Sequence, residues 1–132
     1  MITLDTSGLL AVMNRLDPDH ARTRTALLND DGPYLIPCGI LAEVTYMIEA
    51  RLGLRVLDLF LADLDSRAYA LDCGDGDVPR IKELVKRYAD LSLGFADASV
   101  VACAERSGGR VLTLDRRDFG PVSGEGRITL FP

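Results

Sequence analysis

Short apolar runs alternate along the chain with longer segments in which apolar residues recur at helical spacing. The runs are too short for helices, and most are bounded by Gly, Pro, Asn or Asp, so they predict buried strands. The predicted strands are Ile2 to Leu4, Tyr34 to Ile36, Ala68 to Leu71 and Val111 to Leu114, with a short edge strand from Arg127 to Phe131.

The segments between these strands predict helices, because apolar side chains three and four residues apart share one face of a helix. The predicted helices run from just after Asp5 to about Met13, from Asp17 to about Leu28, from Gly39 to Gly53, from there through Leu64, around Ile81 to Tyr88, and from Phe95 to Arg106. A polar loop is expected over 72–77 and a glycine-rich loop over 120–126.

The alternation of strands and helices indicates the α/β class, since parallel neighbouring strands need crossover connections. We therefore predict a central parallel sheet covered by helices on both faces. The chain has 132 residues, 48% of them hydrophobic, which is enough for one core, and we expect one domain over residues 1–132. We see no secretory signal and no apolar stretch that would span a membrane, so a cytoplasmic protein without membrane contact is expected.

Charge narrows the classes of function. Fifteen Lys and Arg residues against twenty Asp and Glu residues give a formal net charge of −5, which does not favour binding nucleic acid by phosphate neutralisation alone. The basic residues are mostly arginine, which suits bidentate phosphate contacts, although for any single arginine ordinary solvated surface remains the alternative. Bound divalent cations would supply positive charge at a scissile phosphate.

Two acidic residues stand directly after predicted strands. Asp5 follows the first strand and Asp115 follows the strand that ends at Leu114. Ligands of open α/β sheets bind at the carboxyl ends of strands, so both positions are candidates for a site. The alternatives are a helix N-cap for Asp5 and a turn for Asp115.

Two more acids lie on the apolar faces of predicted helices. Glu43 stands between Ile40 and Met47 at helical spacing, so we expect its carboxylate to be partly desolvated. Asp97 shares a face with Val101 near the start of its helix, where the helix dipole alone could explain it. Taken together, the four acids need a common neutraliser, and a hard divalent cation such as Mg²⁺ or Mn²⁺ is the simplest one. Such a centre supports metal-assisted phosphodiester hydrolysis.

The acids also lie in four short motifs that keep a fixed order along the chain. These are Leu4-Asp5-Thr6-Ser7-Gly8-Leu9, Leu41-Ala42-Glu43-Val44, Gly94-Phe95-Ala96-Asp97-Ala98 and Thr113-Leu114-Asp115-Arg116-Arg117-Asp118-Phe119. As an ordered set over essentially the whole chain they closely resemble the PIN-domain family, and more narrowly the VapC-type toxins.

The resemblance implies a three-layer α/β/α domain with a parallel sheet of about five strands. It also implies a magnesium-dependent endoribonuclease that acts as the toxin of a toxin–antitoxin pair and inhibits translation, with RNA as substrate, a cognate antitoxin as partner and frequent homodimerisation. In the family the first and third acids are the principal metal ligands, which carries over to Asp5 and Asp97. Glu43 and Asp115 match the remaining acidic positions, as supporting ligands or ligands of a second metal.

Weaker expectations attach to neighbouring residues. Thr6 matches the hydroxyl residue beside the first acid and is expected to contact substrate, and Asp118 is a secondary metal ligand. We expect Arg116 and Arg117 to hold a substrate phosphate at the rim of the site.

Other classes of function fit less well. His20 is the only histidine, which excludes a nuclease that uses two histidines as acid and base. The three cysteines are far apart and match neither a disulfide framework nor a zinc site. A PIN-like module that binds RNA or protein without cutting it, and a DNA nuclease on the same scaffold, remain the alternatives.

Overall fold

A computed structural model describes all 132 residues and has a five-stranded, wholly parallel sheet. The strand order is β3-β2-β1-β4-β5, so the first strand lies in the middle. The strands are β1 (Ile2–Leu4), β2 (Tyr34–Pro37), β3 (Ala70–Asp72), β4 (Arg110–Leu112) and β5 (Thr129–Phe131).

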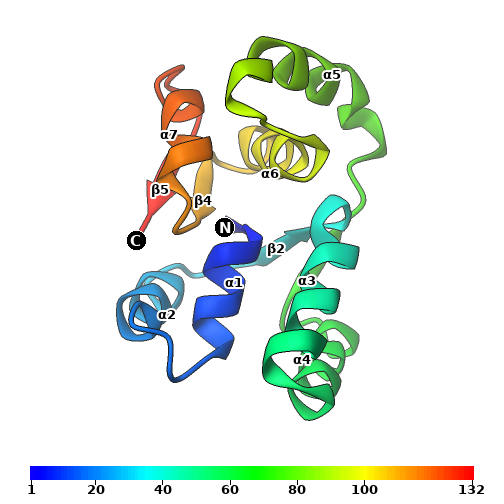
Figure 1. Cartoon of the computed structure of the whole chain (residues 1–132), viewed down its shortest axis with the longest axis vertical. Coiled ribbons are helices and arrows are strands. Elements are labelled where there is room, and N and C mark those ends of the chain that lie inside the picture. The colour runs from blue at the N-terminus through cyan, green and yellow to red at the C-terminus, as the bar shows by residue number, and fades with distance from the viewer.

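Helices form the crossover connections that parallel strands need. They are α1 (Thr6–Met13), α2 (His20–Leu28), α3 (Cys38–Leu52), α4 (Leu54–Asp65), α5 (Val78–Arg87), α6 (Phe95–Arg106) and α7 (Arg116–Ser123), with short 3-10 turns at Asp75–Asp77 and Ala89–Leu91. Figure 1 shows α5 and α6 on one side of the sheet and α1 and α2 on the other. This confirms the predicted three-layer α/β/α arrangement.

The core lies between the sheet and these helices. Ile2, Leu4, Val111 and Leu112 are fully buried on the two central strands, and the middle of α6 is buried almost without interruption from Ala98 to Ala104. That helix contacts β1, β2 and β4 and therefore lies across the centre of the sheet. None of the helices is long and apolar enough to cross a membrane.

Two expectations about the C-terminal third were wrong. The fourth strand ends at Leu112 rather than Leu114. The amide of Thr113 still donates to the Phe131 carbonyl of β5, but the Asp115 amide then donates to the Thr113 hydroxyl, so the chain turns there toward the site. Part of the expected glycine-rich loop is helix α7, although it contains Pro121. Burial of Phe119 and Val122 outweighs the low helix propensity of its glycine and proline.

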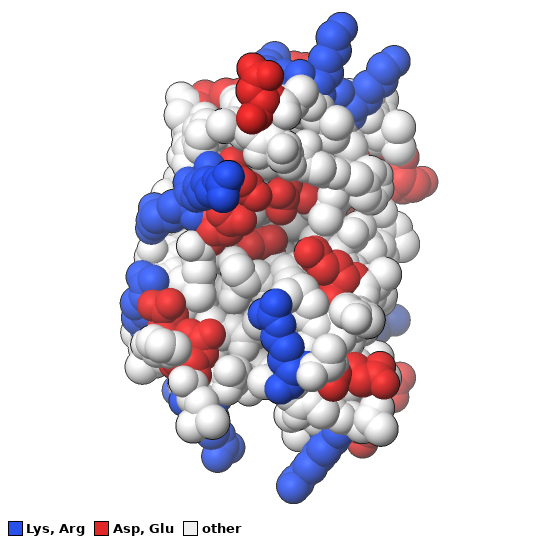
Figure 2. Space-filling model, viewed as in Figure 1, with Lys and Arg blue, Asp and Glu red and all other residues white.

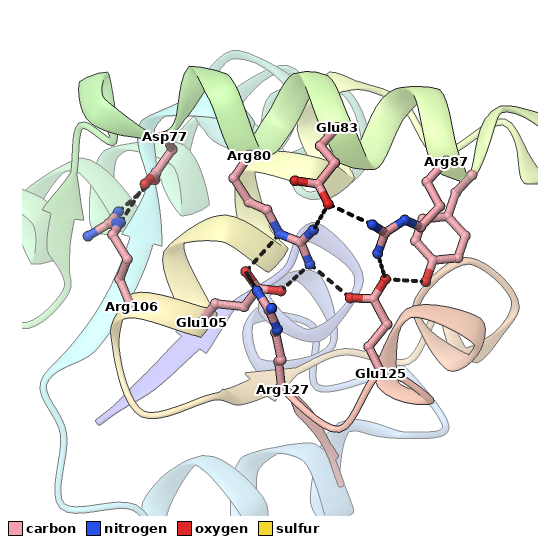
Figure 3. Close-up of polar contacts among 9 residues, drawn as sticks. Asp77, Arg80, Glu83, Arg87, Glu105, Arg106, Glu125 and Arg127 are labelled. Carbon is pink, nitrogen blue, oxygen red and sulfur yellow. Dashed lines mark hydrogen bonds and ion pairs between the residues drawn. The ribbon is translucent and has the colours of Figure 1, made fainter.

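Ion pairs from both ends of α5 join it to α6 and to the turn after α7. Arg80 donates to Glu83, Glu105 and Glu125 at 2.7–3.0 Å, and Arg87 donates to Glu83 and Glu125 (Figure 3). Burial raises the pKa of Glu125, but hydrogen bonds from Tyr88, Arg87 and Arg80 outweigh it and lower this pKa to about 2. These arginines are therefore committed to the fold rather than to a ligand.

Candidate active site

The order of the strands brings together segments from both ends of the chain. Strand β1 lies between β2 and β4, with Leu4 in register with Leu112, so the residues that follow β1 and β4 leave the sheet side by side. The connections from β1 and from β4 run to opposite sides of the sheet order, which is the kind of switch point where α/β sheets bind ligands. Asp5 and Asp115 both follow strands at this point.

Asp5 is buried and tightly held. It caps helix α1, so the capping alternative is correct, and one carboxylate oxygen accepts hydrogen bonds from the Ser7 hydroxyl and the Thr113 hydroxyl, each at 2.8 Å. Its side chain nevertheless lines a pocket of about 210 Å³. Burial raises the pKa of Asp5, and the hydrogen bonds from Ser7 and Thr113 offset that rise only in part.

The hydroxyls of Ser7 and Thr113 are functional groups that the sequence reasoning did not single out. The two oxygens lie 3.1 Å apart, Ser7 accepts from the Leu114 amide at 3.0 Å, and Thr113 accepts from the Asp115 amide at 3.0 Å. They therefore tie α1 to the loop after β4. The signal was present, since each hydroxyl stands two residues from a predicted catalytic acid.

Glu43 lies on α3 and faces the same pocket. Its carboxylate accepts a hydrogen bond from the Thr6 hydroxyl at 3.0 Å. The expected partial desolvation of Glu43 is wrong, because the side chain is exposed while Val44 and Ile48 form the buried face of the helix. Thr6 is itself buried and lines the pocket.

Asp97 stands in the first turn of α6, and its pKa is strongly raised. Burial first, then the nearby charges of Asp5, Asp118 and Asp115 and a hydrogen bond shared with Asp118, raise the pKa of Asp97 to about 7. A helix N-terminus on its own would lower it. The dipole explanation therefore fails, and repulsion among clustered acids in a partly desolvated site dominates.

Asp115 caps helix α7, where its carboxylate accepts from the Asp118 amide at 3.0 Å. The alternative of a turn role for Asp115 is therefore also correct. Asp115 also lines the pocket, and Asp118 lies close enough to influence Asp97. The structure thus brings the four predicted acids to one pocket and places the secondary candidate beside them.

The predicted phosphate-binding arginines lie outside this set. Arg116 donates to the Pro132 carbonyl at 2.7 Å, and both Arg116 and Arg117 are exposed at the start of α7. Neither lines the pocket. Figure 2 shows acidic side chains gathered in a hollow near the middle of this face, with basic side chains beside it.

The carboxylate oxygens of the pocket are the type of ligand that a hard divalent cation prefers. All four acids supply carboxylate oxygens, and the raised pKa of Asp97 reflects burial first and then repulsion from the neighbouring carboxylates. No three acidic, histidine or cysteine side chains converge on a single point. A magnesium ion held by one or two carboxylates with several waters fits this spacing better than a closed protein cage.

Comparison with known proteins agrees with this geometry. A model of the PIN domain family matches residues 2–124. Ribonuclease VapC26 of Mycobacterium tuberculosis is 34% identical over 98% of both chains. The fold is similar to that of M. tuberculosis VapC20, described as a sarcin–ricin loop cleaving toxin, with TM-score 0.81 and 21% identity over both whole chains. It is also similar to FitAcB from Neisseria gonorrhoeae, with TM-score 0.64 and 16% identity over 100% of this chain and 97% of the other. The chain belongs to the PIN domain family.

Proposed function

We propose that this protein is a magnesium-dependent endoribonuclease that hydrolyses RNA phosphodiester bonds. The observation that carries the proposal is the convergence of Asp5, Glu43, Asp97 and Asp115 on one pocket at the switch point of the sheet. Membership of the PIN domain family and the similarity to a ribonuclease over nearly the whole chain support the same activity. Mn²⁺ is the second metal that this oxygen donor set suits.

In this proposal Asp5 and Asp97 hold the metal, and Glu43 and Asp115 complete the site, with Asp118 in a minor role. When bound, the cation would neutralise charge on the scissile phosphate and favour ionisation of an attacking water. The chain itself supplies orientation. Ser7 and Thr113 fix the carboxylate of Asp5, and the hydroxyl of Thr6 fixes that of Glu43.

The test is cleavage of a mixed cellular RNA pool by purified protein in magnesium, in manganese and in chelator. The parent is compared with Asp97→Asn and with Asp58→Asn, a control that removes one exposed carboxylate from α4. We expect discrete fragments that require metal, vanish in Asp97→Asn and persist in Asp58→Asn. A matched DNA substrate separates ribonuclease from deoxyribonuclease activity.

The alternative is a PIN-like module that binds RNA or protein without cutting it. It would be favoured if folded, partner-free parent protein produced no metal-dependent fragments. The acid cluster argues against it, because carboxylates that repel one another cost stability and need a function to retain them.

We further propose that the chain is the toxin of a toxin–antitoxin pair, that it forms a homodimer and that a cognate antitoxin inhibits it. The similarity to ribonuclease VapC26 supports the toxin assignment, whereas the homodimer is an expectation from the family resemblance alone. Expression with and without the neighbouring open reading frame tests the pairing, with growth and RNA cleavage as readouts. Light scattering of the purified chain tests the dimer.

A further inference from the structure

One basic side chain shares the pocket with the four acids. Arg51 lies in the last turn of α3, two helical turns beyond Glu43, and it lines the same 210 Å³ pocket as Asp5, Asp97 and Asp115. It is the only lysine or arginine in that lining. Glu43, Met47 and Arg51 follow one another at intervals of four residues, so the helix presents them as a row.

Arg51 is also uncommitted. Arg22, Arg80, Arg87, Arg106, Arg110 and Arg127 form ion pairs with carboxylates, and Arg116 donates to a backbone carbonyl. Arg51 forms neither an ion pair nor a side-chain hydrogen bond, although acids line the same pocket, and it is exposed to solvent. Its five donors are therefore free for a ligand.

Arg51 lies between this pocket and a neighbouring hollow. A second, smaller hollow of about 100 Å³ is lined by Leu10, Asn14, Asp17, Arg51 and Leu52. Leu10 of α1 and Arg51 of α3 border both hollows, so the two are neighbours along the line where these helices pack. The two hollows together form a continuous depression that leads from the acids past Arg51 over the junction of α1 and α3.

We propose that Arg51 is a substrate-binding residue that holds a phosphate next to the scissile one and so directs single-stranded RNA along the groove between α1 and α3. The inference rests on the proposed ribonuclease function and adds a binding subsite to it. Electrostatics give the reason. Even with one divalent cation bound, the four carboxylates leave a net negative charge in the pocket, which repels the phosphates of RNA. An unpaired guanidinium on the pocket wall offsets that repulsion locally.

A binding residue outside the chemistry should affect KM more than kcat. We expect Arg51→Ala to raise KM for RNA about tenfold, with kcat within about twofold of the parent value. Losing one phosphate contact should also reduce the salt dependence of binding to single-stranded RNA by about 0.7 in the slope of log affinity against log salt. Arg51→Lys keeps the charge and should retain the slope while losing part of the affinity.

The matched control is Arg24→Ala, which removes the same charge from an exposed arginine of α2 that has no ion pair. Cleavage kinetics use a quenched fluorescent RNA pool of random sequence. Binding uses anisotropy of the same labelled pool over a range of salt concentrations, with each variant placed in the Asp97→Asn background so that nothing is cut. Melting curves check that every variant is folded.

The result that supports the subsite is a KM rise and a reduced salt slope in Arg51→Ala, a retained slope in Arg51→Lys and parental behaviour in Arg24→Ala. Parental KM and slope in Arg51→Ala overturn it, as does an equal loss in Arg24→Ala. If the parent cuts no RNA, the anisotropy measurements still test whether Arg51 contacts RNA. A slope that depends on Arg51 keeps the subsite while the nuclease proposal fails, and absence of RNA binding overturns both.

Discussion

Replacing Asp97 by asparagine should make the metal-free protein more stable at neutral pH, although it removes a proposed metal ligand. Asp97 is half-buried among other acids, and its pKa is raised to about 7 from an ordinary value of 3.8. The folded state therefore binds this proton more tightly than the unfolded state does. It follows that ionised Asp97 destabilises the fold, and that parental stability falls as pH rises from about 4 to about 7.

The size of the effect follows from the two pKa values. The gap between 3.8 and about 7 corresponds to at most about 4 kcal/mol at high pH. Solvent reaches part of the side chain and screens the repulsion, so we expect about 1–2 kcal/mol, or about 3–10 °C in Tm for a chain of this length. Asparagine keeps the shape and size of the side chain without the charge.

The assay is thermal melting of parent, Asp97→Asn and the control Asp58→Asn in chelator between about pH 4 and pH 8. The difference in Tm between Asp97→Asn and the parent should be small near pH 4 and should increase as the pH rises to about 7. Magnesium added at pH 8 should raise the Tm of the parent more than that of the variant. An Asp97→Asn protein that melts at or below the parental Tm at pH 8, or an advantage that does not change with pH, refutes the reasoning.

Three further outcomes are expected. Thr113→Val removes one of the two hydroxyl donors to the buried Asp5 carboxylate and should cost about 1–3 kcal/mol in urea unfolding, with Thr113→Ser recovering most of it. Gly8→Ala places a Cβ 2.5 Å from the carbonyl oxygen that ends β4 and should lower stability by about 1–3 kcal/mol, whereas Gly120→Ala meets no atom within 4 Å and should not. A thiol-specific maleimide should label the exposed Cys73 before the partly buried Cys38 and well before the buried Cys103, and Cys73→Ser should remove the fastest of these phases.

Much of the fold was predictable because it depends on periodicity. Buried parallel strands give short continuous apolar runs, and the helices that cover them give regular spacing, so the element order and class followed from the pattern. Helix α7 did not follow from the pattern, because Gly120 and Pro121 interrupt its helical spacing. Its stability comes from burying Phe119 and Val122 against the rest of the fold. Tertiary packing outweighed local propensity at this point.

The site was predictable in its acids and less so in its surroundings. Asp5 and Asp115 were found because they follow strands, but the exposure of Glu43 could not be read from its spacing, since the edge of an apolar stripe faces solvent or core according to which helix packs beside it. The contact of Arg116 with the last residue likewise depends on where the chain end lies in space. Such contacts are set by tertiary structure and leave no local signal.

The hydrogen bond between Asp5 and Thr113 joins residues 108 positions apart. The pocket therefore cannot form before residues 113–115 are free to fold against β1, and a fragment that ends before β4 lacks the Thr113 hydroxyl and the Asp115 carboxylate. If cleavage needs all four acids, a chain that stops before residue 115 has an incomplete site and should be inert, whatever the stability of its remaining fold.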